Sequence, residues 1–337
     1  MPCHAMPCGD MATSIMAAAW GQMYATVVAL LMRFPLSRAS SGTALAMASA
    51  GGHAITGVMA PSGPPHQLLG AIAGDIIGSV FESSPTKDPN FIPLFHKECQ
   101  ITDDSVLTVA TMHALLNKDT STGTYPYADA YRDFGRRYPD AGYGASFIRW
   151  FQDNSAGPYS SWGNGSAMRV SPIGWAFNDR EAVLREAKRS AEVTHNHPEG
   201  VKGAQATALA IYLARTGTSK ANIRHDMEES FGYDLSSKTV DEIRPNYTFD
   251  VSCQRSVPEA ILCFLESDSI ENAIRLAVSL GGDSDTQACI AGSIAEAYYG
   301  PIEDEVALQV RAALPVELLS TVDQFSTFIL TRSRNDD

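Results

Sequence analysis

From residue 67 onward, apolar residues recur at helical spacing in one segment after another. Alternating strand patterns are nearly absent, and residues 247–253 are the best short strand candidate. No linker-like stretch divides 67–337, so the sequence predicts an all-α fold and a single domain over this range. The segments expected to be helical are 68–82, 102–116, 127–137, 144–152, 179–196, 201–215, 219–231, 257–266, 269–280, 284–299, 303–313 and 316–331.

Polar residues and glycines mark the ends of these segments. Thr102 can cap the N-terminus of the helix that follows it, and Asp103 and Asp104 then occupy the first turn, where the helix dipole favours negative charge. Further N-cap candidates are Asn178, Asp179, Ser219 and Asp268. The glycines expected to end helices are Gly217, Gly232, Gly281 and Gly300.

Three glycines in the first of these segments predict a close helix contact. Gly70, Gly74 and Gly78 are spaced at i, i+4 and i+8, so they lie on one helical face. Glycine destabilises a helix by about 1 kcal/mol relative to alanine. A packing reason therefore explains them best, namely a second helix that approaches this face closely.

Residues 1–66 differ in composition from the rest of the chain. They hold one acidic and two basic residues and eight of the eleven methionines. A secretory signal places its positive charge before the apolar stretch, but Arg33 and Arg38 follow it here, and a transit peptide would be richer in arginine. We therefore interpret 1–66 as a non-conforming leader, either disordered or the product of an upstream start, with Met59 as the natural first residue. A targeting signal is the alternative.

Charge and cysteine usage exclude several classes of protein. The net charge is −13, which argues against a sequence-blind nucleic-acid binder because neutralising phosphates requires Lys and Arg. The sequence contains no stretch of about 20 apolar residues, the length that a membrane-spanning helix requires. The six cysteines form no CxxC pair, which argues against a structural zinc site or a disulfide scaffold. We expect a cytoplasmic protein, a monomer by default, that neither enters membranes nor reads nucleic-acid sequence.

Two acidic clusters open predicted helices. One comprises residues 102–105, Thr-Asp-Asp-Ser, and the other residues 281–286, Gly-Gly-Asp-Ser-Asp-Thr. Each offers two carboxylates and a threonine hydroxyl, the oxygen ligands that hard cations such as Mg²⁺ prefer. Helix capping explains either cluster taken alone. The glycine pair before Asp283 favours a ligand site, because glycines let backbone and ligand come close.

The two clusters together would form a strongly negative site if they faced each other. Like charges a few ångströms apart repel by several kcal/mol at an effective dielectric near 20. Protons or metal ions would have to compensate, and two divalent cations would also activate a water. With Glu82 the site would hold five carboxylates against four positive charges. Spacing along the chain leaves open whether the clusters meet.

Four segments, taken in order, resemble the ADP-ribosylglycohydrolase family, the all-α hydrolases that include dinitrogenase-reductase-activating glycohydrolase. They span most of the chain after the leader, from about residue 68 to 300. The segments are residues 70–82 (GAIAGDIIGSVFE), 102–105 (TDDS), 162–170 (WGNGSAMRV) with 190–195 (SAEVTH), and 280–286 (LGGDSDT).

The resemblance implies a compact orthogonal helical bundle, two Mg²⁺ or Mn²⁺ ions, and ADP-ribose or an ADP-ribosylated substrate as partner. The positions that match the family's metal ligands are Thr102, Asp103, Asp104, Asp283, Asp285 and Thr286. Those that match the substrate-binding loop and cleft are Trp162, Gly163, Asn164, Gly165, Ser166 and His195, where loop N–H groups can meet phosphate oxygens. One carboxylate must serve as acid or base, and the candidates are Glu82, Asp103 and Asp283.

Other chemistry-bearing residues have structural interpretations. Asp75 is expected to be a buried, hydrogen-bonded helix residue rather than a ligand. His197 precedes Pro198 and shares no helical face with His195, so metal binding by it is not favoured. Arg169 could pair with a phosphate or with a carboxylate.

The activity that the resemblance implies is hydrolysis of the glycosidic bond between ADP-ribose and an acceptor, with the metals holding the distal ribose and positioning a water. Two alternatives stay open. One is a non-catalytic ADP-ribose-binding or structural relative, which would be expected to lose metal ligands that this chain keeps. The other is a hydrolase of another ribosyl compound on the same scaffold. The acceptor has no signature in the sequence.

Overall fold

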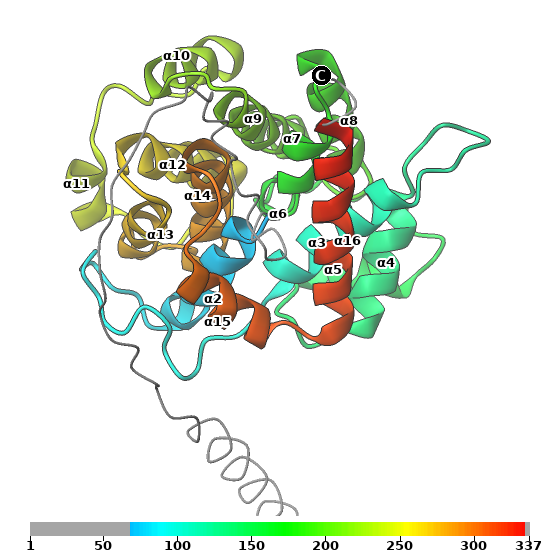
Figure 1. Ribbon diagram of the computed structural model, residues 1–337, viewed down its shortest axis with the longest axis horizontal. Coiled ribbons are helices and arrows are strands. Elements are labelled where there is room, and N and C mark those ends of the chain that lie inside the picture. Colours follow the sequence, from blue (N-terminus) through cyan, green and yellow to red (C-terminus); the bar gives the residue numbers. More distant parts are fainter. Residues whose placement is uncertain (1–67, 334–337) are drawn as a thin grey trace, which may run out of the picture. The chain divides into compact units, whose positions relative to one another are not determined.

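The computed structural model describes residues 68–333, and the leader lies outside them. Figure 1 shows a bundle of helices that cross at varied angles. The described residues contain no strand, only an isolated bridge between Gly163 and Ser252, so the predicted all-α fold is confirmed and the strand expected at 247–253 is absent. The helices are α2 (Gly70–Ser83), α3 (Asp103–Leu116), α4 (Tyr127–Arg137), α5 (Ala145–Gln152), α6 (Gly165–Met168), α7 (Ser171–Ala176), α8 (Arg180–Glu192), α9 (Pro198–Arg215), α10 (Lys220–Phe231), α11 (Val240–Ile243), η1 (Arg244–Asn246), α12 (Cys253–Glu266), α13 (Ile270–Ser279), α14 (Ser284–Tyr299), α15 (Asp304–Ala313) and α16 (Val316–Ser333).

Helices α2 and α14 pack against each other at the centre of the described residues (Figure 1). All three glycines of α2 meet backbone of α14, so the close contact predicted for them is confirmed. A Cβ at Gly70, Gly74 or Gly78 would lie 2.5, 2.0 or 2.5 Å from a carbonyl oxygen of α14, well inside van der Waals contact. Glycine is therefore required here to let the two backbones approach.

A buried carboxylate on α14 binds the N-terminus of α2. Glu296 on α14 is almost fully buried and accepts hydrogen bonds from the backbone N–H groups of Leu69 (3.1 Å) and Gly70 (2.7 Å). These N–H groups belong to the first turn of α2, which has no intrahelical partners for them. Burial raises the pKa of Glu296 to about 7 despite these bonds.

The remaining helices surround this pair. Helix α14 also packs against α13, α12 and α9, while α3 lies against α2, α4 and α16. The buried apolar side chains form one continuous cluster. None of the described helices combines the length and apolar character that a membrane crossing requires.

Most predicted helix ends agree with the structure. Thr102, Asp179 and Ser219 cap their helices through side-chain oxygens, and Gly232 ends α10 in the left-handed conformation. The expected cap Asp268 is wrong, because the neighbouring Ser269 accepts the bond from Asn272 N–H. Helix α12 starts at residue 253, four residues earlier than predicted, with Pro258 inside it. The short helices α6, α7 and α11 were not predicted, since each is too brief to show a period.

Candidate metal centre and substrate cavity

Asp75 on α2 fixes the N-terminus of α3. Its Oδ1 accepts from the Thr102 hydroxyl at 2.7 Å, and its Oδ2 accepts from the backbone N–H groups of Thr102 (3.0 Å) and Ser105 (3.1 Å) and from the Ser105 hydroxyl. Asp75 itself is fully buried. The expectation of a buried, hydrogen-bonded aspartate is therefore confirmed, and these bonds hold the first acidic cluster against α2.

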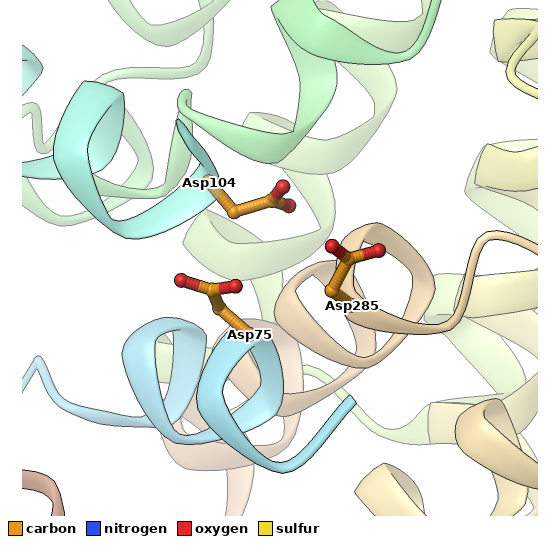
Figure 2. A group of neighbouring side chains, drawn as sticks. All are labelled: Asp75, Asp104 and Asp285. Carbon is orange, nitrogen blue, oxygen red and sulfur yellow. The ribbon is translucent and has the colours of Figure 1, made fainter. Parts of the chain in front are cut away.

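The two acidic clusters meet, which the sequence left open. Carboxylate oxygens of Asp75, Asp104 and Asp285 all lie within 4.8 Å of one another. Figure 2 shows these three side chains converging from α2, α3 and α14. The hydroxyl of Thr286 donates to Asp104 Oδ2 at 3.3 Å, whereas Asp104 Oδ1 is buried and has no hydrogen-bond partner among the described residues. An unpaired buried carboxylate oxygen is costly unless a proton or cation meets it.

A second group of carboxylates shares one member with the first. Oxygens of Glu82, Asp283 and Asp285 also lie within 4.8 Å of one another. Asn164 Nδ2 donates to Asp283 Oδ2 at 2.6 Å and to the Ser256 hydroxyl at 3.1 Å, which orients the Asp283 carboxylate. Asp285 is thus common to both groups. Asp103 belongs to neither, although it lines the same cavity.

Burial and mutual repulsion raise the pKa values of these carboxyl groups. Burial is the main cause that raises the pKa of Asp285, and repulsion from Asp104 and Asp283 adds to it. Burial, with the charges of Asp75 and Asp283, raises the pKa of Asp103 to about 8. The pKa of Glu82, whose side chain is exposed at the cavity, is raised for the same two reasons. At 4.8 Å and an effective dielectric near 20, two ionised carboxylates would repel by about 3.5 kcal/mol.

The donor set suits a hard divalent cation. It consists only of carboxylate and hydroxyl oxygens, the ligands preferred by Mg²⁺ and Mn²⁺. The unpaired Asp104 Oδ1 is a ready ligand atom. Positive charge between the two clusters would offset the mutual repulsion that contributes to these raised pKa values. The residues present could therefore hold metal ions.

The acidic groups form one wall of a cavity of about 530 Å³, a size typical of small-ligand sites. The cavity contains most of the predicted site residues. It is lined by Glu82, Thr102, Asp103, Asp104, Gly163, Asn164, Gly165, His195, Asp283, Asp285 and Thr286. Two predicted substrate-binding residues do not line it. The Trp162 side chain is exposed, and the buried Ser166 hydroxyl donates to the carbonyl oxygen of Gly200.

The glycine-rich loop uses part of its backbone internally. The N–H of Gly163 donates to the Ser161 hydroxyl at 3.1 Å, and that of Asn164 donates to the carbonyl oxygen of Val251 at 2.8 Å. Two N–H groups expected to meet phosphate are therefore already bonded. Gly165 lies against the imidazole of His195, where a Cβ would come within 3.2 Å of Nε2. His195 therefore contacts this loop and lines the same cavity.

Arg169 and His197 have protein partners. The buried Arg169 donates to the carbonyl oxygen of Ser190 (3.2 Å) and to the Thr194 hydroxyl (2.8 Å). Among the described residues it therefore does not pair with a carboxylate, which was one of the two partners expected from the sequence. The His197 side chain accepts from the N–H of Glu199 and caps α9, in line with the low expectation of metal binding there.

Several cavity residues carry no recognisable signal in the sequence. Tyr159, Phe147, Asp140 and Val251 line the cavity from loops and from α5. None belongs to a motif, and only the folded chain brings them together. Asp75 was singled out in the sequence as structural, but its proximity to Asp104 and Asp285 could not be read there.

The described residues thus define a helical protein with a cavity walled by carboxylates that could hold cations. The chain belongs to the ADP-ribosylglycohydrolase family, whose model matches residues 67–327. It is accordingly a hydrolase of the glycohydrolase class.

Curated relatives carry related names. ADP-ribosylhydrolase ARH3 of Bos taurus is 28% identical over 314 residues, covering 69% of this chain and 84% of the relative. The Mus musculus protein of the same name is 29% identical over 314 residues, covering 69% and 82%. ADP-ribosylarginine hydrolase Tri1 of Pseudomonas putida (strain GB-1) is 29% identical over 151 residues, covering 42% and 39%.

A solved structure shares the fold. It is described as an ADP-ribosylglycohydrolase-related protein complex and matches with a TM-score of 0.57, covering 77% of this chain and 95% of that chain. Its sequence identity is 21%, so the likeness shows the fold alone.

Proposed function

We propose that this protein hydrolyses the glycosidic bond between ADP-ribose and an acceptor, with two Mg²⁺ or Mn²⁺ ions in the cavity. The proposal is carried by one observation: two sets of three neighbouring carboxylates have Asp285 in common, and Asp285 lines the cavity. Family membership and the names of the relatives supply the ADP-ribosyl substrate class. A pair of sites with one shared carboxylate is an arrangement that suits two neighbouring cations.

The side chains have distinct tasks in this proposal. The ions would be held by Thr102, Asp103, Asp104, Asp283, Asp285 and Thr286. When bound, divalent cations would supply a nucleophilic water at neutral pH and stabilise developing negative charge. Asp75 would hold the first cluster in place through its hydrogen bonds to Thr102 and Ser105. Asn164 would orient Asp283.

Proton transfer falls to a carboxyl group at the cavity. Glu82, Asp103 and Asp283 are the candidates, and each has a raised pKa. A raised pKa suits a group that holds a proton near neutral pH and delivers it to a leaving group. Glu82 is the least buried of the three, so its carboxyl group can exchange protons with solvent. The surrounding negative charge would also stabilise an oxocarbenium-like transition state.

The substrate would occupy the rest of the cavity. His195, Gly163 and Gly165 line the same cavity as the acidic clusters, and they are our proposed contacts to the ADP-ribosyl group. We retain Trp162 and Ser166 as proposed loop residues that act without lining the cavity. Beyond the site, we propose that 67–337 is one domain, and that the protein is a cytoplasmic monomer without sequence-specific nucleic-acid binding.

The test uses a panel of ADP-ribosylated substrates: arginine, serine, nucleic-acid ends and O-acetyl-ADP-ribose. The full chain is incubated with each substrate and Mg²⁺, and free ADP-ribose is measured. We expect release from at least one substrate, loss of release with EDTA, and recovery when Mg²⁺ is returned. Binding of ADP-ribose without release from any substrate would contradict the proposal and favour a non-catalytic relative. Release of ribose from other ribosyl compounds alone would also contradict it.

A further inference from the structure

A chain of hydrogen bonds leads from Arg169 to His195. Arg169 Nη2 donates to Thr194 Oγ1 at 2.8 Å, and Thr194 Oγ1 lies 2.7 Å from His195 Nδ1. All three residues are buried, and His195 alone retains a small exposed fraction at the cavity. The guanidinium also stacks on the Tyr131 ring, with its central carbon 4.1 Å from the ring centroid. Arg169 is therefore held in place from two sides.

The direction of the bond from Arg169 follows from the atoms involved. A guanidinium only donates hydrogen bonds, so Thr194 Oγ1 must be the acceptor from Arg169. The hydroxyl has a single proton to donate. His195 Nδ1 lies 2.7 Å from this hydroxyl, and the Tyr159 side chain is its other hydrogen-bond neighbour. When Thr194 donates to Nδ1, that nitrogen is an acceptor without a proton, and the imidazole proton resides on Nε2.

The neighbours of the imidazole favour its neutral form. Burial lowers the pKa of His195 well below 6.5, and the positive charge of Arg169 lowers it further. Tyr159 lies beside it, with ring centroids 5.9 Å apart, and burial raises the pKa of Tyr159 to about 12, so this phenol adds no negative charge. A neutral ring has one donor and one acceptor, and the Thr194 bond decides which nitrogen is which.

The geometry points to Arg169 and Thr194 as positioning residues that hold His195 in its Nε2-protonated tautomer, so that Nε2–H can donate to an oxygen of the ADP-ribosyl group. This inference rests on the proposed function for the identity of the ligand, but the tautomer itself does not. Nε2 lies beside Gly165 of the cavity loop and has no hydrogen-bond partner in the described part of the chain. A ligand oxygen would supply that partner.

Three substitutions separate this role from simple packing. Thr194→Val keeps the shape of the side chain and removes the hydroxyl. Thr194→Ser restores the hydroxyl. Thr207→Val is the matched control, because Thr207 is also a buried threonine, on α9, and its hydroxyl has no hydrogen-bond partner among the described residues.

The primary measurement is the ¹⁵N NMR spectrum of histidine side chains in the ligand-free full chain. The His195 signals are identified by their loss in His195→Gln. We expect Nδ1 unprotonated and Nε2 protonated in the unsubstituted protein, Thr194→Ser and Thr207→Val, and a mixture of tautomers in Thr194→Val. A protonated Nδ1 in the unsubstituted protein, or an unchanged tautomer in Thr194→Val, would overturn the inference.

The second measurement is the affinity for ADP-ribose in the presence of Mg²⁺. Loss of one well-placed hydrogen bond typically weakens binding by up to about tenfold, so we expect that loss in Thr194→Val. Thr194→Ser and Thr207→Val should bind within about twofold of the unsubstituted protein. Equal affinity in all variants would refute the donor role of Nε2. No ADP-ribose binding by the unsubstituted protein would instead refute the proposed function, and the NMR result would still decide the tautomer.

Discussion

Gly74→Ala tests the close contact between α2 and α14 on which the whole site rests. The added methyl carbon would lie 2.0 Å from the carbonyl oxygen of Ala288, 2.3 Å from its carbonyl carbon and 2.6 Å from the N of Cys289. All three atoms are backbone, so no side chain can rotate away. Ordinary contact begins near 3.4 Å, and the helices would have to separate locally by about 1.4 Å.

Stability and function should both fall. Overpacking costs up to about 3 kcal/mol, and the gain in helix propensity offsets about 1 kcal/mol, which leaves about 2 kcal/mol of destabilisation. For a chain of this size that lowers Tm by roughly 5 °C. The same displacement moves Asp75 and Glu82 away from the acidic N-terminus of α14. A misplacement of about 1 Å can reduce activity about 10²-fold.

The assay combines urea unfolding, Mg²⁺ titration by calorimetry and ADP-ribose release. Gly157→Ala is the matched control, since a methyl there meets no atom within 4 Å, and it should leave all three measurements unchanged. Weakened Mg²⁺ binding by a variant that is still folded at the assay temperature would support the reasoning. Gly74→Ala with the stability and Mg²⁺ affinity of the parent would refute it, because the two helices could then not be in backbone contact.

Three other substitutions test the site and the helix contact that supports it. Asp285→Asn removes the carboxylate common to both groups, and ADP-ribose release should fall at least about 10²-fold while the unfolding midpoint changes little or rises. Asn164→Leu removes the donor to Asp283, and Mg²⁺ affinity should fall about 10- to 100-fold in calorimetry; unchanged affinity would show that Asp283 needs no such partner. Glu296 holds its proton more tightly in the native state, with a pKa of about 7 against 4.5, so its contribution to stability decreases as pH rises between these values. The stability difference between the parent and Glu296→Gln should therefore shift by about 3 kcal/mol from pH 4.5 to pH 7, measured by urea unfolding at each pH.

Local features of the fold were predictable because their causes are local. Apolar spacing, capping side chains and glycines act over a single turn, so most helices and the cap of α3 agree with the structure within a few residues. Residues 247–253 form no strand because strand pairing needs a neighbour, and only one bridge forms there. Asp268 and Ser269 are equally good caps by composition, and the backbone conformation of the turn chose the serine.

The two acidic clusters come together only when the chain folds. Asp104 and Asp285 are far apart in sequence, and no spacing rule connects them. The glycine face of α2 indicated a close helix partner but not which helix would be that partner. Side-chain direction was equally hidden: Trp162 and Ser166 belong to the same short motif as Asn164, yet the first is exposed and the second bonds to Gly200, away from the cavity.

Hydrogen-bond saturation distinguishes the roles of the three clustered aspartates. Asp75 accepts four bonds from Thr102 and Ser105, which use both of its oxygens, so its carboxylate is already committed to holding α3. Asp104 has an oxygen without any partner among the described residues. A cation between them would bind the free oxygen of Asp104. Asp75 would hold that carboxylate in position indirectly, through its hydrogen bonds to the N-terminus of α3. From the sequence, Asp75 could be either a metal ligand or a buried helix residue. Its hydrogen bonds to Thr102 and Ser105 favour the buried helix residue. They also explain why Asp75 lies so close to the acidic cluster at 102–105.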